Sequence, residues 1–241
     1  MIKFFRKIRQ KLLIENKFSK YLIYAIGEIL LVMIGILLAF QANKWKEIKT
    51  EQELEIKLIK EIQNGIKSDL IDVQENYHYH EKILKSQYKV IDWLQGDLEL
   101  NDSTAYQFSM ATKRTSFLIS KAPFESLKEF GLNRVSNDSI KHKIIRLYDI
   151  LYPQYEDVLS MYYLHSDKLF DSAINYFEVW DLTPSVLSNI PINIPELKGD
   201  HVVLMRFKYL TNFNKYLVNA NSRMEELQIE IIDLMELELN K

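Results

Sequence analysis

The stretch YAIGEILLVMIGILL, Tyr24 to Leu38, decides the fold prediction because it is apolar except for one acid, Glu28. It lies inside a longer apolar run, residues 21–40, in which Glu28 is again the one charged residue. At about 1.5 Å per residue, a helix of this length spans about 30 Å, the thickness of the hydrocarbon core of a bilayer. The run therefore predicts a transmembrane helix, to which we assign residues 21–43.

Aromatic residues flank this run. Tyr21 and Tyr24 at one end and Trp45 at the other are of the kind that anchor a helix at the two membrane interfaces. A buried helix of a globular domain is disfavoured, because such helices seldom stay apolar on all sides for this length. A cleaved signal peptide is disfavoured too, because its apolar core is shorter and Phe40-Gln41-Ala42 lacks the small residue expected two positions before the cleavage site.

The charges on either side of the run predict its orientation. Residues 1–20 contain seven Lys or Arg and one acid, whereas residues 41–60 contain five lysines and four glutamates. This bias predicts a cytoplasmic N-terminus, with the large domain on the other side of the membrane. Apolar residues at helical spacing also predict that residues 1–20 lie on anionic lipid as a basic amphipathic segment. These apolar residues are Ile2, Phe5, Ile8 and Leu12.

The composition restricts the classes of function. In 241 residues, 33 acids and 31 bases give a formal net charge of −2, which offers no electrostatic reason to expect nucleic acid as a partner. Only 6 glycines and 5 prolines occur, so helices are favoured over a turn-rich β architecture. Cysteine is absent, which excludes disulfides, thiolate zinc sites and cysteine nucleophiles.

Apolar periodicity predicts an all-α fold, in which an elongated extracytoplasmic helical bundle, residues 44–241, follows the transmembrane helix. Spacings of three and four from Leu54 to Leu94 predict a long first helix that continues from the membrane. Asn64-Gly65 is expected to weaken this helix rather than end it. Loops are expected near residues 96–104 and 181–200, where polar residues and prolines gather.

The second half of the chain predicts further helices. Pro123 and Gly131 bracket a short helix, and Pro153 is expected to kink or divide the next one. Thr115 to Ser120 can form an extended segment. The last helix carries a coiled-coil-like seam, for which packing within a bundle is at least as well supported as a dimer zipper. The seam consists of Leu210, Phe213, Leu217, Ala220, Met224, Leu227, Ile231 and Leu234.

Several short motifs lie between Arg6 and Trp45. They are a basic start, Glu15-Asn16-Lys17, Tyr24 to Ile29, Ile34 to Leu37, Gln41 and Asn43-Lys44-Trp45. Together they resemble the opening of an uncharacterised family of single-pass membrane proteins that is common in Bacteroidota. Lys44 departs from the pattern, where a second Asn is expected, and a looser similarity follows in Phe124 to Asp149. The resemblance implies a protein of the inner membrane with a helical periplasmic domain, and it implies no activity.

No catalytic or cofactor motif is found: the sequence lacks His-Glu-x-x-His, Gly-x-Ser-x-Gly, a phosphate loop and a dinucleotide fingerprint. We therefore predict a protein that is not an enzyme and holds no cofactor or metal. His78 and His80 point about 200° apart on a helix, so they cannot bind one ion together, and we interpret both as solvated surface residues. The aromatic residues after position 147 are interpreted as core rather than as a ligand pocket. They are Tyr148, Tyr152, Tyr155, Tyr162, Tyr163, Phe170, Tyr176, Phe177 and Trp180.

Glu28 is the best indication of mechanism. A charged acid near the bilayer centre costs about 2.5–3.5 kcal/mol, so it should find a partner or bind a proton. On a helix, Gly35 and Ala39 lie within about 20° of Glu28, and Gly27 lies beside it. Small residues permit close approach of two helices, so we predict that this face packs against another membrane helix. In the alternative, a lone helix tolerates Glu28 by protonation or by extending its side chain towards the cytoplasm.

Three hypotheses of function follow. We favour a membrane-anchored, non-catalytic interaction or scaffold protein, whose partners are the lipid bilayer and either a second copy or another membrane protein. A small-ligand sensor bundle that acts through a partner is the second hypothesis. An ion-coupled membrane subunit that uses Glu28 is the third.

Overall fold

The computed structural model describes residues 18–178 and 189–240. Most of these residues are helical, and none of them belongs to a strand of a sheet. The prediction of an all-α fold is therefore confirmed. The nearest approach to a sheet among the described residues is one antiparallel bridge between Phe177 and Pro191. The chain divides into two compact units, Met1–Glu55 and Ile56–Lys241, and each is described by itself. The predicted amphipathic segment lies almost entirely outside the described residues.

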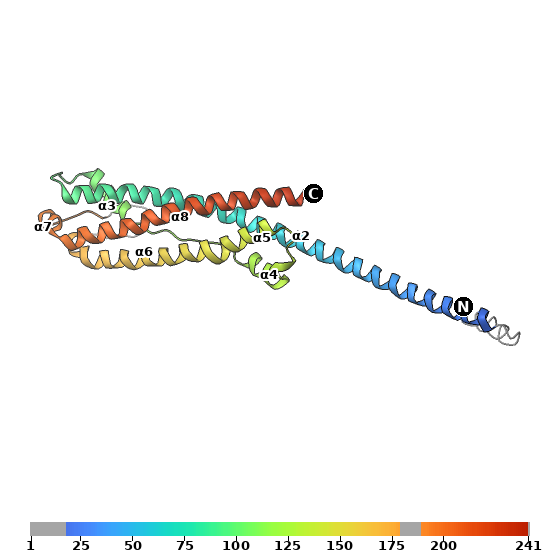
Figure 1. Cartoon of the computed structure of the whole chain (residues 1–241). Helices are drawn as coiled ribbons and strands as arrows, with labels where there is room; N and C mark the ends of the chain where they lie inside the picture. The colour runs from blue at the N-terminus through green and yellow to red at the C-terminus, as the bar shows by residue number, and fades with distance from the viewer. Residues whose placement is uncertain (1–17, 179–188, 241) are drawn as a thin grey trace. The chain divides into compact units, whose positions relative to one another are not determined.

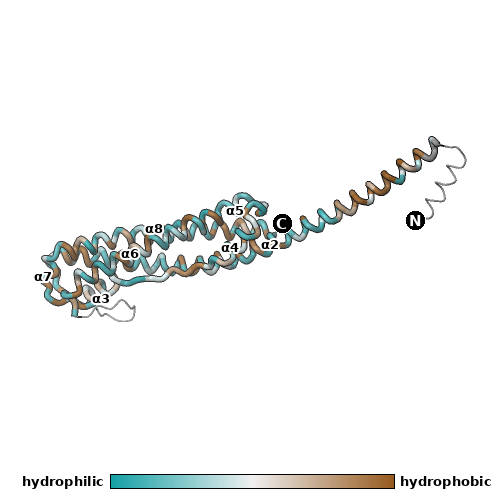
Figure 2. The backbone as a smooth tube through the Cα atoms, turned by 90° about the horizontal axis from the view of Figure 1, so that it is seen from below, coloured by the Kyte–Doolittle hydropathy of each residue, from teal (hydrophilic) through white to brown (hydrophobic). Residues whose placement is uncertain are grey.

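Helix α2, Phe18–Gln95, is one uninterrupted α-helix that runs through both units. Near its start, an 18-residue window has a mean hydropathy of 2.5 (Figure 2). None of this window is buried by the described chain. A core helix of a globular domain is mostly buried, and this window is not. The helix is long and apolar enough to cross a membrane. It also passes through Asn64-Gly65 without a break, as predicted.

In the second unit, the C-terminal part of α2 packs with α6, Tyr152–Ala173, and α8, His201–Leu239 (Figure 1). Helix α8 is antiparallel to α2, because Gln63 contacts Ile232 whereas His80 contacts Asn214. Apolar side chains from all three helices fill one common core.

Helix α6 is likewise antiparallel to α8 and therefore parallel to α2. Tyr152 contacts Gln228, and Asn221 contacts Tyr155, so residue numbers fall along α8 as they rise along α6. Two parallel neighbours cannot be joined by a tight turn, and the intervening chain has to travel back along the bundle.

Part of this return is made by an extended segment, residues 113–120, which we call the strap. It connects α3, Asp102–Ala111, with α4, Ala122–Phe130, and runs antiparallel to α2. The nine residue steps from position 111 to 120 lie opposite 18 steps of α2, from position 87 back to 69. At about 3.3 Å per extended and 1.5 Å per helical residue, both cover about 27–30 Å. In a bundle of four alternating segments, the strap thus occupies the position of the second helix, between α2 and α6 in chain order.

Pro153 divides the continuous helical segment that is formed by α5, η2 and α6, as predicted. Helix α5, Asp138–Ile145, continues directly into a π-helical turn, η2, Arg146–Leu151, and then into α6 with Pro153 in its first turn. Proline has no N–H for the helical ladder, so the hydrogen-bond pattern changes just before it.

The shorter elements lie near the ends of the long helices. They are η1, Leu132–Arg134, η3, Ile174–Tyr176, and α7, Ile194–Gly199. Helix α7 lies within residues 181–200, so the prediction of a loop over that whole range is wrong. Asp200 separates α7 from α8 and caps α8, with its side chain accepting from the N–H groups of Val202 and Val203.

The seam predicted on the last helix is a buried face of the bundle. Leu210, Leu217, Met224 and Ile231 are at most 1% exposed. Their neighbours are α6 and α2 of the same chain, so this face is used for internal packing.

Candidate functional site

The four residues predicted to form a membrane-packing face all lie on the first part of α2. Gly27, Gly35 and Ala39 are exposed and Glu28 is half-buried. A Cβ added to Gly27 or Gly35 would meet nothing within 4 Å, so packing inside the described chain does not require a glycine at either position.

The structure describes the side chains of two of the three residues predicted to anchor the helix at the membrane interfaces. Tyr24 is 40% exposed and Trp45 is 69% exposed. Tyr21 belongs to α2, but its side chain lies outside the described residues. The two described rings are therefore uncovered by the rest of the chain, as an interfacial anchor requires.

In the second unit, the structure shows a polar seam that the sequence analysis missed. Along α2, the buried positions follow each other at alternating spacings of three and four, and several of them are polar. These are Asp69, Asn76, His80 and Gln87, none more than 5% exposed. Leu54 and Tyr88 belong to the apolar spacing that runs from Leu54 to Leu94, but they are 43% and 46% exposed, so this spacing does not mark the buried face at every position.

The polar seam of α2 binds the backbone of the strap. The carboxylate of Asp69 accepts from the N–H of Ser120 at 2.8 Å, and that of Asp72 accepts from the N–H of Leu118 at 3.1 Å. The Nδ2 of Asn76 donates to the carbonyl of Ser116 at 3.0 Å. Side chains thus supply hydrogen-bond partners for the backbone of an extended segment that is mostly half-buried and has no neighbouring strand.

Tyrosines of α6 bind the strap from the other side. The hydroxyl of Tyr162 donates to the carbonyl of Lys113 at 2.9 Å, and that of Tyr163 donates to the carbonyl of Thr115. Tyr162 and most of the other described aromatic residues are buried, which confirms their interpretation as core. The hydroxyls of Tyr152, Tyr162 and Tyr163, however, donate to specific acceptors that an apolar core would not need.

Asp69 is the deepest charge-bearing group of the seam. Besides Ser120, its carboxylate accepts from the hydroxyl of Tyr152 at 3.0 Å, and Tyr152 in turn accepts from Nε2 of Gln228 at 2.8 Å. Burial raises the pKa of Asp69, while the hydrogen bond from Ser120 opposes that rise. This chain of bonds joins α2, the strap, α6 and α8.

His80 is not a solvated surface residue, so that interpretation is wrong. It is 0% exposed, and its Nε2 lies 3.0 Å from Oγ1 of Thr115 on the strap. Burial lowers the pKa of His80 to about 4, which keeps the ring neutral near pH 7. His78, two positions earlier, is exposed, as predicted.

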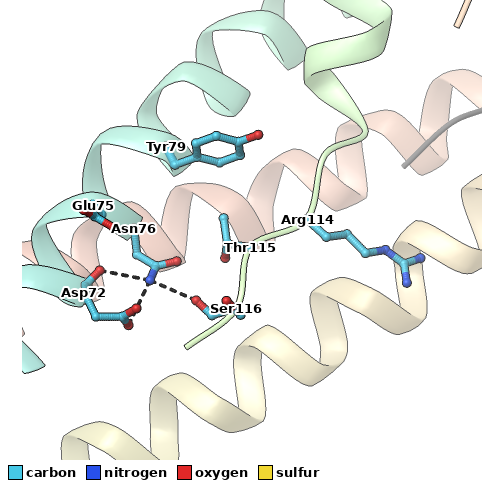
Figure 3. A pocket seen from close by; sticks show the side chains of 7 residues that line it. All are labelled: Asp72, Glu75, Asn76, Tyr79, Arg114, Thr115 and Ser116. Carbon is cyan, nitrogen blue, oxygen red and sulfur yellow. Dashed lines mark hydrogen bonds between the residues drawn. The ribbon is translucent and has the colours of Figure 1, made fainter. Parts of the chain in front are cut away.

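Where the strap crosses α2, it leaves an open hollow of about 260 Å³ (Figure 3). We call it the strap hollow. Its lining combines acidic, amide, hydroxyl and aromatic groups from α2 with side chains of the strap. The lining residues are Asp72, Glu75, Asn76, Tyr79, Arg114, Thr115 and Ser116.

The groups around the strap hollow are mainly hydrogen-bond acceptors and donors. No group of three or more His, Asp or Glu side chains stands close enough to hold a metal ion in residues 18–178 and 189–240. The one strap cation at the hollow, Arg114, pairs with Asp167 and donates from Nε to Ser166 at 3.3 Å. Its guanidinium points away from Asp72, towards α6 (Figure 3).

Comparison of the chain with protein-family models, curated proteins and solved structures found no match, so the assignment of a site rests on the geometry of the chain itself.

Proposed function

We propose that this protein is a membrane-anchored, non-catalytic interaction protein that presents a helical bundle at the membrane surface. The observation that carries the proposal is the continuity of α2, in which an apolar, uncovered segment and one wall of the bundle belong to a single helix. A soluble bundle has no use for an exposed segment with a mean hydropathy of 2.5, because its transfer from water to lipid is strongly favourable.

The proposed topology has a cytoplasmic N-terminus and a periplasmic bundle at the inner membrane. Its support is the excess of Lys and Arg in residues 1–20 over residues 41–60. A reporter enzyme that is active only outside the cytoplasm, fused after the last residue of the full chain, tests this. We expect activity, and activity of a cytoplasm-specific reporter at the same place would contradict the orientation.

The proposed interaction surface in the membrane is the face that holds Gly27, Glu28, Gly35 and Ala39. Its support is that no side chain of the described chain approaches either glycine, so the small residues leave room for a second helix. The occupant is a second copy of this chain or another membrane protein.

Substitutions on this face test the association. Gly35→Leu should weaken it by adding bulk, and Glu28→Leu should weaken it by removing a hydrogen-bonding group, whereas Glu28→Gln should preserve it. Leu37→Ala is the matched control, because Leu37 lies about 180° from Glu28 on the helix. Cross-linking of the full chain in membranes measures the association. Equal cross-linking of all four variants would refute a role for this face.

A further inference from the structure

The strap hollow is rich in hydrogen-bond acceptors and poor in positive charge. The Asp72 carboxylate lies half-buried at its wall and Glu75 lies exposed beside it. Within the described ranges, neither carboxylate forms an ion pair with a Lys or Arg. Burial raises the pKa of Asp72, and the charge of Glu75 adds to that rise.

The side chain of Asn76 carries an acceptor atom, Oδ1, that has no hydrogen-bond donor in the described protein, and this is an observation independent of the two acids. Its side chain is 5% exposed, and its Nδ2 lies within 3.1 Å of three acceptors: the Asp72 carbonyl, the Asp72 carboxylate and the Ser116 carbonyl. Three acceptors around one end of the amide fix its orientation, because only the NH2 group can donate to them. The Oδ1 atom therefore points the other way, to the Thr115 side of Asn76 (Figure 3). This atom is buried and accepts no hydrogen bond from the described protein, although Asn76 lines the strap hollow.

These features define the ligand by its chemistry. A primary ammonium group carries three N–H donors and one positive charge, which match one amide oxygen and two carboxylates. The Tyr79 ring forms a further wall, on which the methylene groups next to an ammonium can lie with a cation–π contribution. The volume of about 260 Å³ lies near the lower end of the range of small-molecule sites, about 300–1,000 Å³, so the ligand has few heavy atoms.

We propose that the strap hollow binds a small aliphatic primary amine in its ammonium form, with Asn76, Asp72 and Glu75 as acceptors and Tyr79 against its carbon chain. A divalent metal is a poorer fit, because the described residues offer no cluster of three ligating side chains. An anionic ligand is disfavoured by the two carboxylates and by the pairing of Arg114 with Asp167. The site goes beyond the anchoring and interaction proposed above and does not depend on them.

Isothermal titration of the full chain in nonionic detergent tests the proposal, with n-butylammonium chloride as the probe. A ligand of this size that meets three acceptors should bind with a dissociation constant of about 1 mM. Tetramethylammonium chloride at equal ionic strength has the same charge but no N–H donor, and it should bind at least about ten-fold more weakly.

Variants locate the site. Glu75→Gln should weaken binding of n-butylammonium by about five-fold. Asp72→Asn should weaken it by about ten-fold, because the Asp72 carboxylate is less exposed to water than that of Glu75. Glu81→Gln is the matched control: it removes the same charge from the same helix, outside the lining of the hollow, and should leave binding unchanged. Circular dichroism confirms that each variant is folded.

Three results would overturn the proposal. They are no binding of n-butylammonium by the folded native protein, equal binding of tetramethylammonium, and equal weakening by Glu81→Gln and Glu75→Gln. Glu75 is exposed and makes no hydrogen bond within the described structure, so its variant should fold normally even if Asp72→Asn does not.

Discussion

His80 of α2 and Asn214 of α8 are joined by two hydrogen bonds in the buried centre of the bundle. Nδ1 of His80 lies 2.5 Å from Oδ1 of Asn214, and Nδ2 of Asn214 donates to the carbonyl of His80 at 3.0 Å. Nδ2 of Asn214 also donates to Oε1 of Gln87 at 3.2 Å, so its Oδ1 has to be the acceptor. The hydrogen of His80 is therefore on Nδ1, and its Nε2 accepts from the hydroxyl of Thr115.

This arrangement predicts a loss of stability in acid. The pKa of His80 is about 4 in the folded protein and about 6.5 in the unfolded chain, so below about pH 6.5 only the unfolded state binds the proton. Between pH 6.5 and pH 4 the free energy of unfolding should fall by about 3 kcal/mol because of this residue. Urea unfolding of the full chain at a series of pH values measures the fall.

His80→Gln is the comparison for this experiment, because an amide can still donate to Asn214 and accept from Thr115. Burial raises the pKa of Asp69 and of Asp72, and this opposes the effect of His80 in acid, so the informative quantity is the difference between native and variant protein. The native protein should lose more stability than the variant from pH 6.5 to 4. Parallel pH dependences would show that His80 does not titrate as the structure requires.

A second prediction concerns the attachment of the strap to α6. Tyr162→Phe removes the hydroxyl that donates to the carbonyl of Lys113, and it leaves that acceptor in a site where Lys113 is 2% exposed. We expect a loss of about 1–3 kcal/mol in the free energy of unfolding. Tyr209→Phe, at a ring that is 50% exposed, should change stability by less than about 0.5 kcal/mol. Similar unfolding curves for both variants would mean that the tyrosine does not hold the strap.

Two glycines should respond to alanine with opposite signs. Gly65 is inside α2, and an added Cβ would meet Cγ of Pro123 at 3.5 Å and Ser120 at 3.6 Å, which are ordinary contacts. Gly65→Ala should therefore stabilise the protein by about 0.5–1 kcal/mol through helix propensity. Gly131 has φ of 108°, so Gly131→Ala should destabilise it by about 1–2 kcal/mol. Midpoints of urea unfolding give both values, and a destabilised Gly65→Ala would contradict the spacing between α2 and the strap.

The long helices were predictable because their apolar residues recur at the helical period. The seam of α8 is apolar at almost every position, so one pattern gave both its helix and its buried face. Pro153 was equally informative, since the lack of an N–H acts locally whatever the tertiary structure.

The extended conformation of Thr115 to Ser120 was predictable from the sequence, but its attachment to α2 was not, because only apolar residues were used to define the buried face of that helix. Asp69 and Asn76 are seven apart, as are His80 and Gln87, and all four fall in register with buried apolar positions of α2. That register was a usable signal. The hydrogen-bond partners of Asp69 and Asn76 could not be recognised from the sequence, because they are backbone groups of an extended segment that lies far away along the chain.

Membrane insertion of the apolar part of α2 is the central claim, and alkaline carbonate extraction of cell membranes tests it most directly. The full chain should stay in the membrane pellet. A variant with lysine at Leu31 and Ile34 should be released, because each charge near the bilayer centre costs about 2.5–3.5 kcal/mol. Lysines at Ile56 and Ile71, exposed positions of the same helix beyond the apolar segment, should leave the protein in the pellet. Release of the native full chain into the carbonate supernatant would contradict the account.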